Sequence, residues 1–119
     1  MNRVDGKIGE DLALDYLLAK GLRLRERNWR CSHLEVDLIM EDETFLHIVE
    51  VRSRTAPYMV SPLDSVNREK QRRLFRAASA YVKRHNIDKE VIFDIVAITY
   101  EEDSHYIEYH KGALIPLYV

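Results

Sequence analysis

The sequence is poor in the features that cross-link a chain or anchor it in a membrane. It has one cysteine, Cys31, so no disulfide can form within the chain, which is typical of a reducing compartment. No apolar run approaches the roughly 20 residues of a membrane-spanning helix. The N-terminal stretch MNRVDGKIGEDL is charged throughout and lacks the apolar centre of a signal peptide. These absences predict a soluble, cytoplasmic protein with no membrane partner.

A large excess of one charge is also absent. The chain has 18 Lys and Arg against 20 Asp and Glu, a net charge of −2. A globally basic nucleic-acid-binding protein is therefore not indicated, and any basic surface must be local. The 119 residues contain 46% hydrophobic amino acids and no linker or repeat, which predicts a single domain over residues 1–119.

The hydrophobic periodicity predicts two helices and five strands. A first helix over 6–21 is expected to stop at Gly21, and a loop with two prolines precedes the second helix. The expected strands are 22–30, 34–40, 45–53, 90–100 and 104–110, and the second helix is 65–85. The order helix, three strands, helix, two strands predicts an α/β fold in which helices cover both faces of a mixed sheet.

The strand FLHIVEVRSR carries Glu50 within an apolar run. If EDET is a tight hairpin loop, Met40 pairs with Phe45, so that Glu35 faces Glu50 and Asp37 lies diagonal to it on the same sheet face. Like charges on a partly buried face raise each other's pKa. A divalent cation would remove that cost, hold a phosphodiester and activate water. A buried or rim salt-bridge network of Asp37, Glu50 and Arg52 is the alternative.

Six stretches in order carry a resemblance to a known family: GKIGEDLALDYLLAKG, RERNWR, LEVDLI, IVEVRSR, EKQRRLFRAASAYV and FDIVAI. Together they resemble the YraN-like family, placed in the PD-(D/E)XK, restriction endonuclease-like, nuclease superfamily and similar to archaeal Holliday-junction resolvases. The match covers nearly the whole chain. It implies a restriction endonuclease-like α/β/α sandwich with a central mixed five-stranded sheet.

The resemblance also implies an active site. Asp37 and Glu50 would hold Mg²⁺ or Mn²⁺, and Glu10 would hold a second metal ion or orient water. Arg52, the fourth expected catalytic residue, stands where the family usually has Lys. Arginine stays protonated, so Arg52 could clamp the scissile phosphate but hardly act as a base. Lys70 could supply an ammonium group in its place.

The second helix has an unbalanced charge. It carries Arg68, Lys70, Arg72, Arg73, Arg76, Lys83 and Arg84 against a single acid, Glu69. A solvated helix face would usually mix the two signs, so a phosphate-contacting basic strip is favoured over that alternative. The expected nucleic-acid-binding residues are Arg54, Arg68, Lys70, Gln71 and Arg72. Such contacts position the backbone and do not read sequence.

The predicted function is hydrolysis of DNA phosphodiester bonds by a metal-dependent endonuclease, with branched or single-stranded DNA as candidate substrates. The alternative is a catalytically impaired nucleic-acid-binding domain, because Arg52 replaces the usual Lys. A small interaction module whose acids are merely paired is a third class. The resemblance also implies that the protein could act as a homodimer. Cys31 and His33 lack the further ligands of a zinc site, and Asp94 is expected to be structural.

Overall fold

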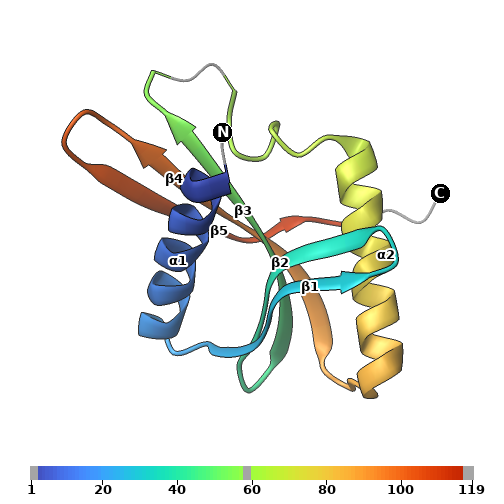
Figure 1. Cartoon of the computed structure of the whole chain (residues 1–119). Coiled ribbons are helices and arrows are strands. Elements are labelled where there is room, and N and C mark those ends of the chain that lie inside the picture. The colour runs from blue at the N-terminus through green and yellow to red at the C-terminus, as the bar shows by residue number, and fades with distance from the viewer. Residues whose placement is uncertain (1–2, 58–59, 117–119) are drawn as a thin grey trace.

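The computed structural model describes residues 3–57 and 60–116, without the side chains of 3–5. In chain order its elements are α1 (Arg3–Ala19), β1 (Arg23–Cys31), β2 (Leu34–Glu41), β3 (Phe45–Thr55), α2 (Arg68–His85), β4 (Glu90–Tyr100) and β5 (His105–Leu114) (Figure 1). The predicted order is confirmed. The main differences are at the ends, since β1, β2, β3 and β5 all extend past the predicted strands and α2 starts later.

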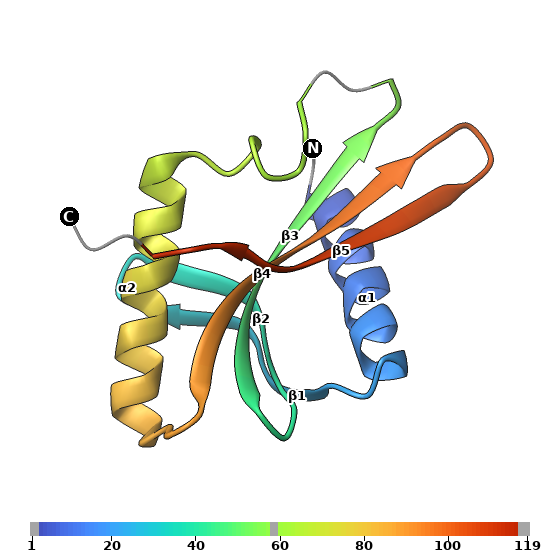
Figure 2. The ribbon, with the colours of Figure 1, turned by 180° about the vertical axis from the view of Figure 1, so that it is seen from behind.

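The strands form one sheet in the order β1-β2-β3-β4-β5. The β3–β4 pair is parallel and the other pairs are antiparallel, so the sheet is mixed. Figures 1 and 2 show α1 and α2 on opposite sides of the sheet. The predicted α/β/α sandwich with a five-stranded mixed sheet is confirmed, and it is consistent with a restriction endonuclease-like fold. Neither α1 nor α2, as far as the chain is described, combines the length and the apolar character that a membrane-spanning helix requires.

Each helix covers its own apolar cluster, one on each face of the sheet. The α2 cluster includes Ile39, Leu46, Ile48, Leu74 and Tyr81, and the α1 cluster includes Ala13, Leu17, Leu38, Val49 and Val96. Adjacent residues of β2 and β3 thus serve opposite faces, as the period of two predicts. Burying a large apolar side chain stabilises the fold by about 1.5–3 kcal/mol, so these clusters hold the helices in place.

The observed register of the β2–β3 hairpin differs from the predicted one. Met40 lies opposite His47, so the predicted Met40–Phe45 pair is wrong. The reason is the turn, in which Asp42 Oδ1 accepts the backbone N–H groups of Thr44 and Phe45 at 2.9 and 2.7 Å. The slip is two residues, so Ile39 and Ile48 keep the face that they were predicted to share.

The register also moves Glu35 away from Glu50. Glu35 lies opposite Arg30 of β1, and the β2–β3 ladder begins only at Leu38, opposite Val49. Before Leu38, the β1–β2 hairpin turns away from β3, which continues beside β4 (Figure 1). The sheet therefore opens between β2 and β3 at the position of Asp37.

A glycine lets α1 approach this part of the sheet closely. A Cβ atom on Gly9 would lie 2.2 Å from Ser53 Oγ of β3. A larger residue would force the Ser53 side chain to move or the helix to shift outward. The close packing places the next residue, Glu10, near the opening.

Candidate active site

Asp37 lies at the opening of the sheet and takes over a backbone contact there. Its Oδ2 accepts the Val51 N–H at 2.8 Å, where β2 no longer provides a strand partner. Burial and the nearby charge of Glu50 raise the pKa of Asp37 to about 7, and the charge of Lys70 opposes the rise. The fold thus holds an acid in a setting that disfavours its charge.

Glu50 forms the other half of the carboxylate pair, as we call Asp37 and Glu50 together. It is only 2% exposed in the centre of β3. Its Oε1 is buried and has no hydrogen-bond partner among the described residues. A buried, unsatisfied carboxylate oxygen is costly, and it commonly marks a place for an ion or a water molecule.

Two cations lie beside the second oxygen of Glu50. Arg52 Nη1 is 3.3 Å from Oε2, and Lys70 Nζ is 3.7 Å from the same atom. The remaining nitrogens of Arg52 donate to Ser65 in the loop before α2, with Nε 3.2 Å from its Oγ and Nη2 bonded to its carbonyl oxygen. An adjoining pocket of about 210 Å³ is lined by Arg52, Ser65, Asn67, Glu69, Lys70 and Arg73.

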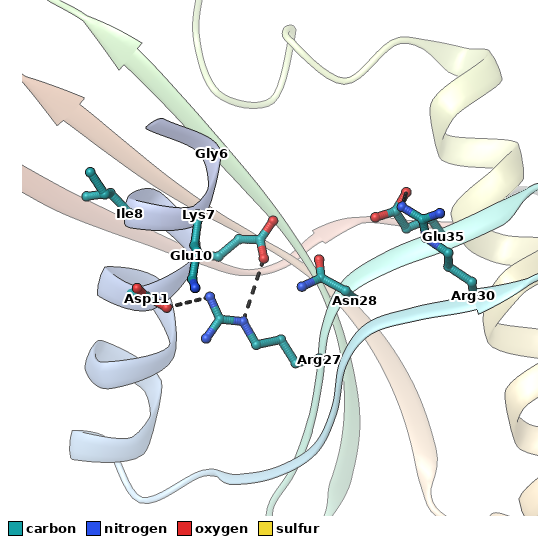
Figure 3. Close-up of a pocket in the computed structure, with 9 residues that line it drawn as sticks. All are labelled: Gly6, Lys7, Ile8, Glu10, Asp11, Arg27, Asn28, Arg30 and Glu35. Atoms are coloured by element: carbon teal, nitrogen blue, oxygen red, sulfur yellow. Dashed lines mark hydrogen bonds and ion pairs between the residues drawn. The ribbon is translucent and has the colours of Figure 1, made fainter. Parts of the chain in front are cut away.

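Glu10 reaches the region from α1, on the other side of the opening. It borders a cleft of about 890 Å³ and points toward Arg27 and Asn28 of β1 (Figure 3). Arg27 Nε lies 3.7 Å from its Oε1. Burial, and next the charge of Asp37, raise the pKa of Glu10, whereas Asn28 and Arg27 oppose the rise. Glu10 therefore lies within electrostatic range of the carboxylate pair.

The three predicted carboxylates do not form one compact cluster. Among the described residues, no group of three or more His, Cys, Asp and Glu side chains is placed to hold a metal ion. The structure brings Asp37 and Glu50 together and keeps Glu10 at the border of the cleft. Glu35 lies farther out in the cleft beside Arg30, with Oε2 3.7 Å from its Nη2 (Figure 3).

The expected nucleic-acid-binding residues fall into two groups. Arg68 and Arg72 are exposed on the first turns of α2, and Lys70 is partly buried next to Glu50. The Gln71 side chain turns back, and its Nε2 donates to the carbonyl oxygen of Val66 at 2.9 Å. The N-terminal end of α2 thus combines outward cations with side chains that fix the preceding loop.

Arg54 has a different environment. Its guanidinium donates to Thr99 Oγ1 at 3.0 Å, to the Val60 carbonyl oxygen at 2.7 Å and to Glu108 Oε2 at 2.9 Å. These contacts link β3 to β4, to β5 and to the loop after β3. Arg54 therefore acts as a tether in the structure, and its predicted contact with phosphate stays a prediction.

A second polar cluster lies away from the carboxylate pair. The fully buried His47 places Nδ1 2.7 Å from Asp94 Oδ2 and Nε2 2.9 Å from Asp42 Oδ2. Tyr109 also donates to Asp94 Oδ2, at 2.7 Å, and the Gly112 N–H donates to Oδ1 at 2.8 Å. Asp94 is thus a structural acceptor, in line with its expected role. The sequence did not predict the contact between His47 and Asp94, because no spacing in the sequence shows that β3 and β4 are neighbours.

The fold and the site define an α/β/α protein with a buried carboxylate pair where its sheet opens. The chain belongs to Uncharacterised protein family UPF0102, whose model matches residues 9–98. A UPF0102 protein of Bacteroides thetaiotaomicron is 40% identical over 111 residues, 93% of this chain and 92% of that relative. Another, from Herminiimonas arsenicoxydans, is 43% identical over 96 residues, 81% of this chain and 77% of that relative. The predicted YraN-like family membership is confirmed.

Proposed function

We propose that the protein is a metal-dependent phosphodiesterase of the PD-(D/E)XK superfamily that cleaves DNA. The observation that supports this most directly is the carboxylate pair, in which Glu50 is buried beside Asp37 and its Oε1 accepts no hydrogen bond from an N–H or hydroxyl donor of the described residues. A purely structural ion pair would be expected to satisfy both oxygens. In a hydrolytic metal site, by contrast, a carboxylate oxygen without a protein donor can bind the ion.

The residues fit a hard divalent cation such as Mg²⁺ or Mn²⁺. Mg²⁺ prefers oxygen ligands and usually takes one or two protein carboxylates while keeping several waters. Asp37 and Glu50 provide that number, and a cation between them would offset the repulsion that raises the pKa of Asp37. Such an ion supplies charge neutralisation at the phosphate and activation of water.

The chain's own side chains would position the substrate around the pair. Asp37 and Glu50 would hold the ion, and Glu10 would orient water or a second ion from the α1 side of the opening. Arg68 and Arg72 would contact phosphates along the exposed face of α2, where the charges are mostly of one sign. Branched and single-stranded DNA are the proposed substrates, and a homodimer stays a prediction.

The test is cleavage of labelled single-stranded, duplex and four-way-junction DNA with Mn²⁺. Wild type is compared with Asp37→Asn and Glu50→Gln, which retain shape but lose charge. Glu43→Gln is the matched control, because the Glu43 side chain is 90% exposed. We expect cleavage by wild type and the control and a loss of at least about 10²-fold in the two site variants. Equal activity in all four proteins would exclude the pair as the active site.

Arg52 favours a second candidate, a nucleic-acid-binding domain without turnover. Its guanidinium is bonded to Ser65 and Glu50 and always carries its charge, so it cannot accept a proton from water. This candidate predicts binding of junction or single-stranded DNA by wild type, no cleavage with Mg²⁺ or Mn²⁺, and weaker binding after Arg68→Gln. Binding without cleavage would decide in its favour.

A further inference from the structure

The two cations beside Glu50 differ in how many hydrogen bonds they donate to the rest of the protein. Each of the three side-chain nitrogens of Arg52 has a partner, two on Ser65 and one on Glu50. Lys70 Nζ lies 3.7 Å from Glu50 Oε2, which is beyond hydrogen-bond distance, and has no hydrogen bond to any other described residue. Lys70 thus keeps all of its donors available, whereas three of the five N–H donors of Arg52 are bonded within the protein.

Hydrogen bonds at the first turn of α2 fix the position of Lys70. The side chain of Asn67, the N-cap of α2, accepts the Lys70 N–H at 2.8 Å, and Gln71 Nε2 bonds the Val66 carbonyl oxygen just ahead of the helix. The first turn is therefore held without using the ammonium group. The Lys70 side chain is 35% exposed and borders the 210 Å³ pocket, so it connects the buried pair to open space.

Lys70 and Arg52 also differ in how they meet the carboxylate pair. Lys70 Nζ lies 3.7 Å from Glu50 Oε2, whereas Arg52 Nη1 donates to the same oxygen at 3.3 Å and its other nitrogens bond Ser65. The helix cation is thus close to Glu50 without a hydrogen bond to it, whereas the strand cation is bonded to Glu50 and to the loop.

We infer that Lys70, rather than Arg52, contacts the scissile phosphate, and that Arg52 is a structural clamp between β3 and the loop before α2. This inference rests on the proposed function. The ammonium is a compact charge with three rotatable donors, suited to a non-bridging phosphate oxygen whose negative charge grows during the reaction. In this role the ammonium transfers no proton.

The test moves the ammonium from the helix to the strand. Cleavage with Mn²⁺ is measured for wild type, Lys70→Ala, the double variant Arg52→Lys with Lys70→Ala, and Lys20→Ala. Lys20 is exposed just after α1 and serves as the control for losing one positive charge. We expect Lys70→Ala to lose about 10²- to 10³-fold in kcat and the double variant to regain at least about tenfold. The control should match wild type.

A second measurement separates this inference from the proposed function. The carboxyl carbon of Asp37 is titrated by NMR in the same proteins, and its pKa should rise in Lys70→Ala because an opposing charge is lost. If a folded Lys70→Ala variant cleaves DNA at the wild-type rate, the inference is overturned and the proposed function still stands. No cleavage by wild type would overturn the proposed function. Independently of cleavage, an unchanged pKa of Asp37 in Lys70→Ala would show that the charge of Lys70 does not act on the carboxylate pair.

Discussion

Asp37 Oδ2 accepts the backbone N–H of Val51, the residue next to Glu50, at 2.8 Å. A carboxylate therefore stands in for a strand partner at the point where the β2–β3 ladder has ended. The arrangement satisfies one backbone donor but sets two acids side by side. Such a local cost is common at functional sites, where removing the charge often stabilises the fold.

Asp37→Asn should stabilise the protein at pH 8. The pKa of Asp37 is raised from 3.8 to about 7 in the folded state, so the native protein binds this proton more tightly than the unfolded chain does. Stability therefore falls as the pH rises from about 4 to 7, and the full cost is present above that range. Removing the charge should raise the free energy of unfolding by about 1–3 kcal/mol at pH 8, since the coupling to Glu50 and the weaker bond to Val51 reduce the full effect.

Urea unfolding of wild type and Asp37→Asn at pH 5 and pH 8 measures this difference. Asp103→Asn is the control, because Asp103 is exposed in the turn between β4 and β5. The gain should be larger at pH 8 than at pH 5 and absent in the control. A loss of stability at pH 8 would mean that the hydrogen bond to Val51 outweighs the cost of the charge.

Binding of Mn²⁺ should depend on pH through the same group. Asp37 must lose its proton to act as a ligand, and its pKa is about 7. The apparent Kd measured by calorimetry should therefore rise up to about tenfold per pH unit below 7 and level off above it. Asp37→Asn should bind far more weakly and without this slope. A flat profile in wild type would show that Asp37 is not the ligand that titrates.

The sequence was sufficient to predict the layers of the fold because its apolar periods are strong. The period of two along LEVDLIM and FLHIVEVRS predicted the face that Asp37 and Glu50 share, and a two-residue slip in register does not change it. The register itself depends on the Asp42 side chain, which bonds two backbone N–H groups in the turn. Nothing in the period of the strands reveals that bond.

The position of Glu10 and the roles of the arginines were harder to predict. They depend on where the β1–β2 hairpin leaves the sheet and on how the loop before α2 returns to β3, and both are tertiary features. Arg54 follows the strand pattern of Arg52 in sequence, yet it bonds Thr99 and Glu108, residues distant in the chain. Charge runs in a sequence show which side chains are available and do not show which ones the fold uses.

Arg54 and Arg68 should therefore respond differently to substitution. Arg54→Gln should lower the free energy of unfolding by about 1–3 kcal/mol, because a charged, largely buried tether to Glu108 is lost. Arg68→Gln should leave stability within about 0.5 kcal/mol, because Arg68 is exposed. Binding of single-stranded DNA, measured by fluorescence anisotropy at two salt concentrations, should weaken and become less dependent on salt in Arg68→Gln. The reverse pattern would assign phosphate contact to Arg54 and exclude Arg68.

The His47 cluster should make stability depend on pH above neutrality. Burial works against a charge on His47, but the hydrogen bonds with Asp94 and Asp42 outweigh it and raise the pKa of His47 above its usual 6.5. Both ring nitrogens face carboxylates, so the charged imidazolium satisfies both. Because the folded pKa is raised, this contribution is complete below pH 6.5 and is lost as the pH rises through the folded pKa.

His47→Gln should therefore destabilise the protein most at low pH and flatten the decline above pH 6.5. We expect a loss of about 2–4 kcal/mol at pH 6, because Asp94 is fully buried and would lose its cationic partner. Tyr109→Phe is the comparison: it removes one neutral donor to Asp94 and should cost about 1–2 kcal/mol without changing the pH dependence. Urea midpoints from pH 5 to 9 distinguish the two variants. A wild-type protein whose stability does not fall above pH 6.5 would show that His47 is neutral in the fold and that its carboxylate partners are held by other donors.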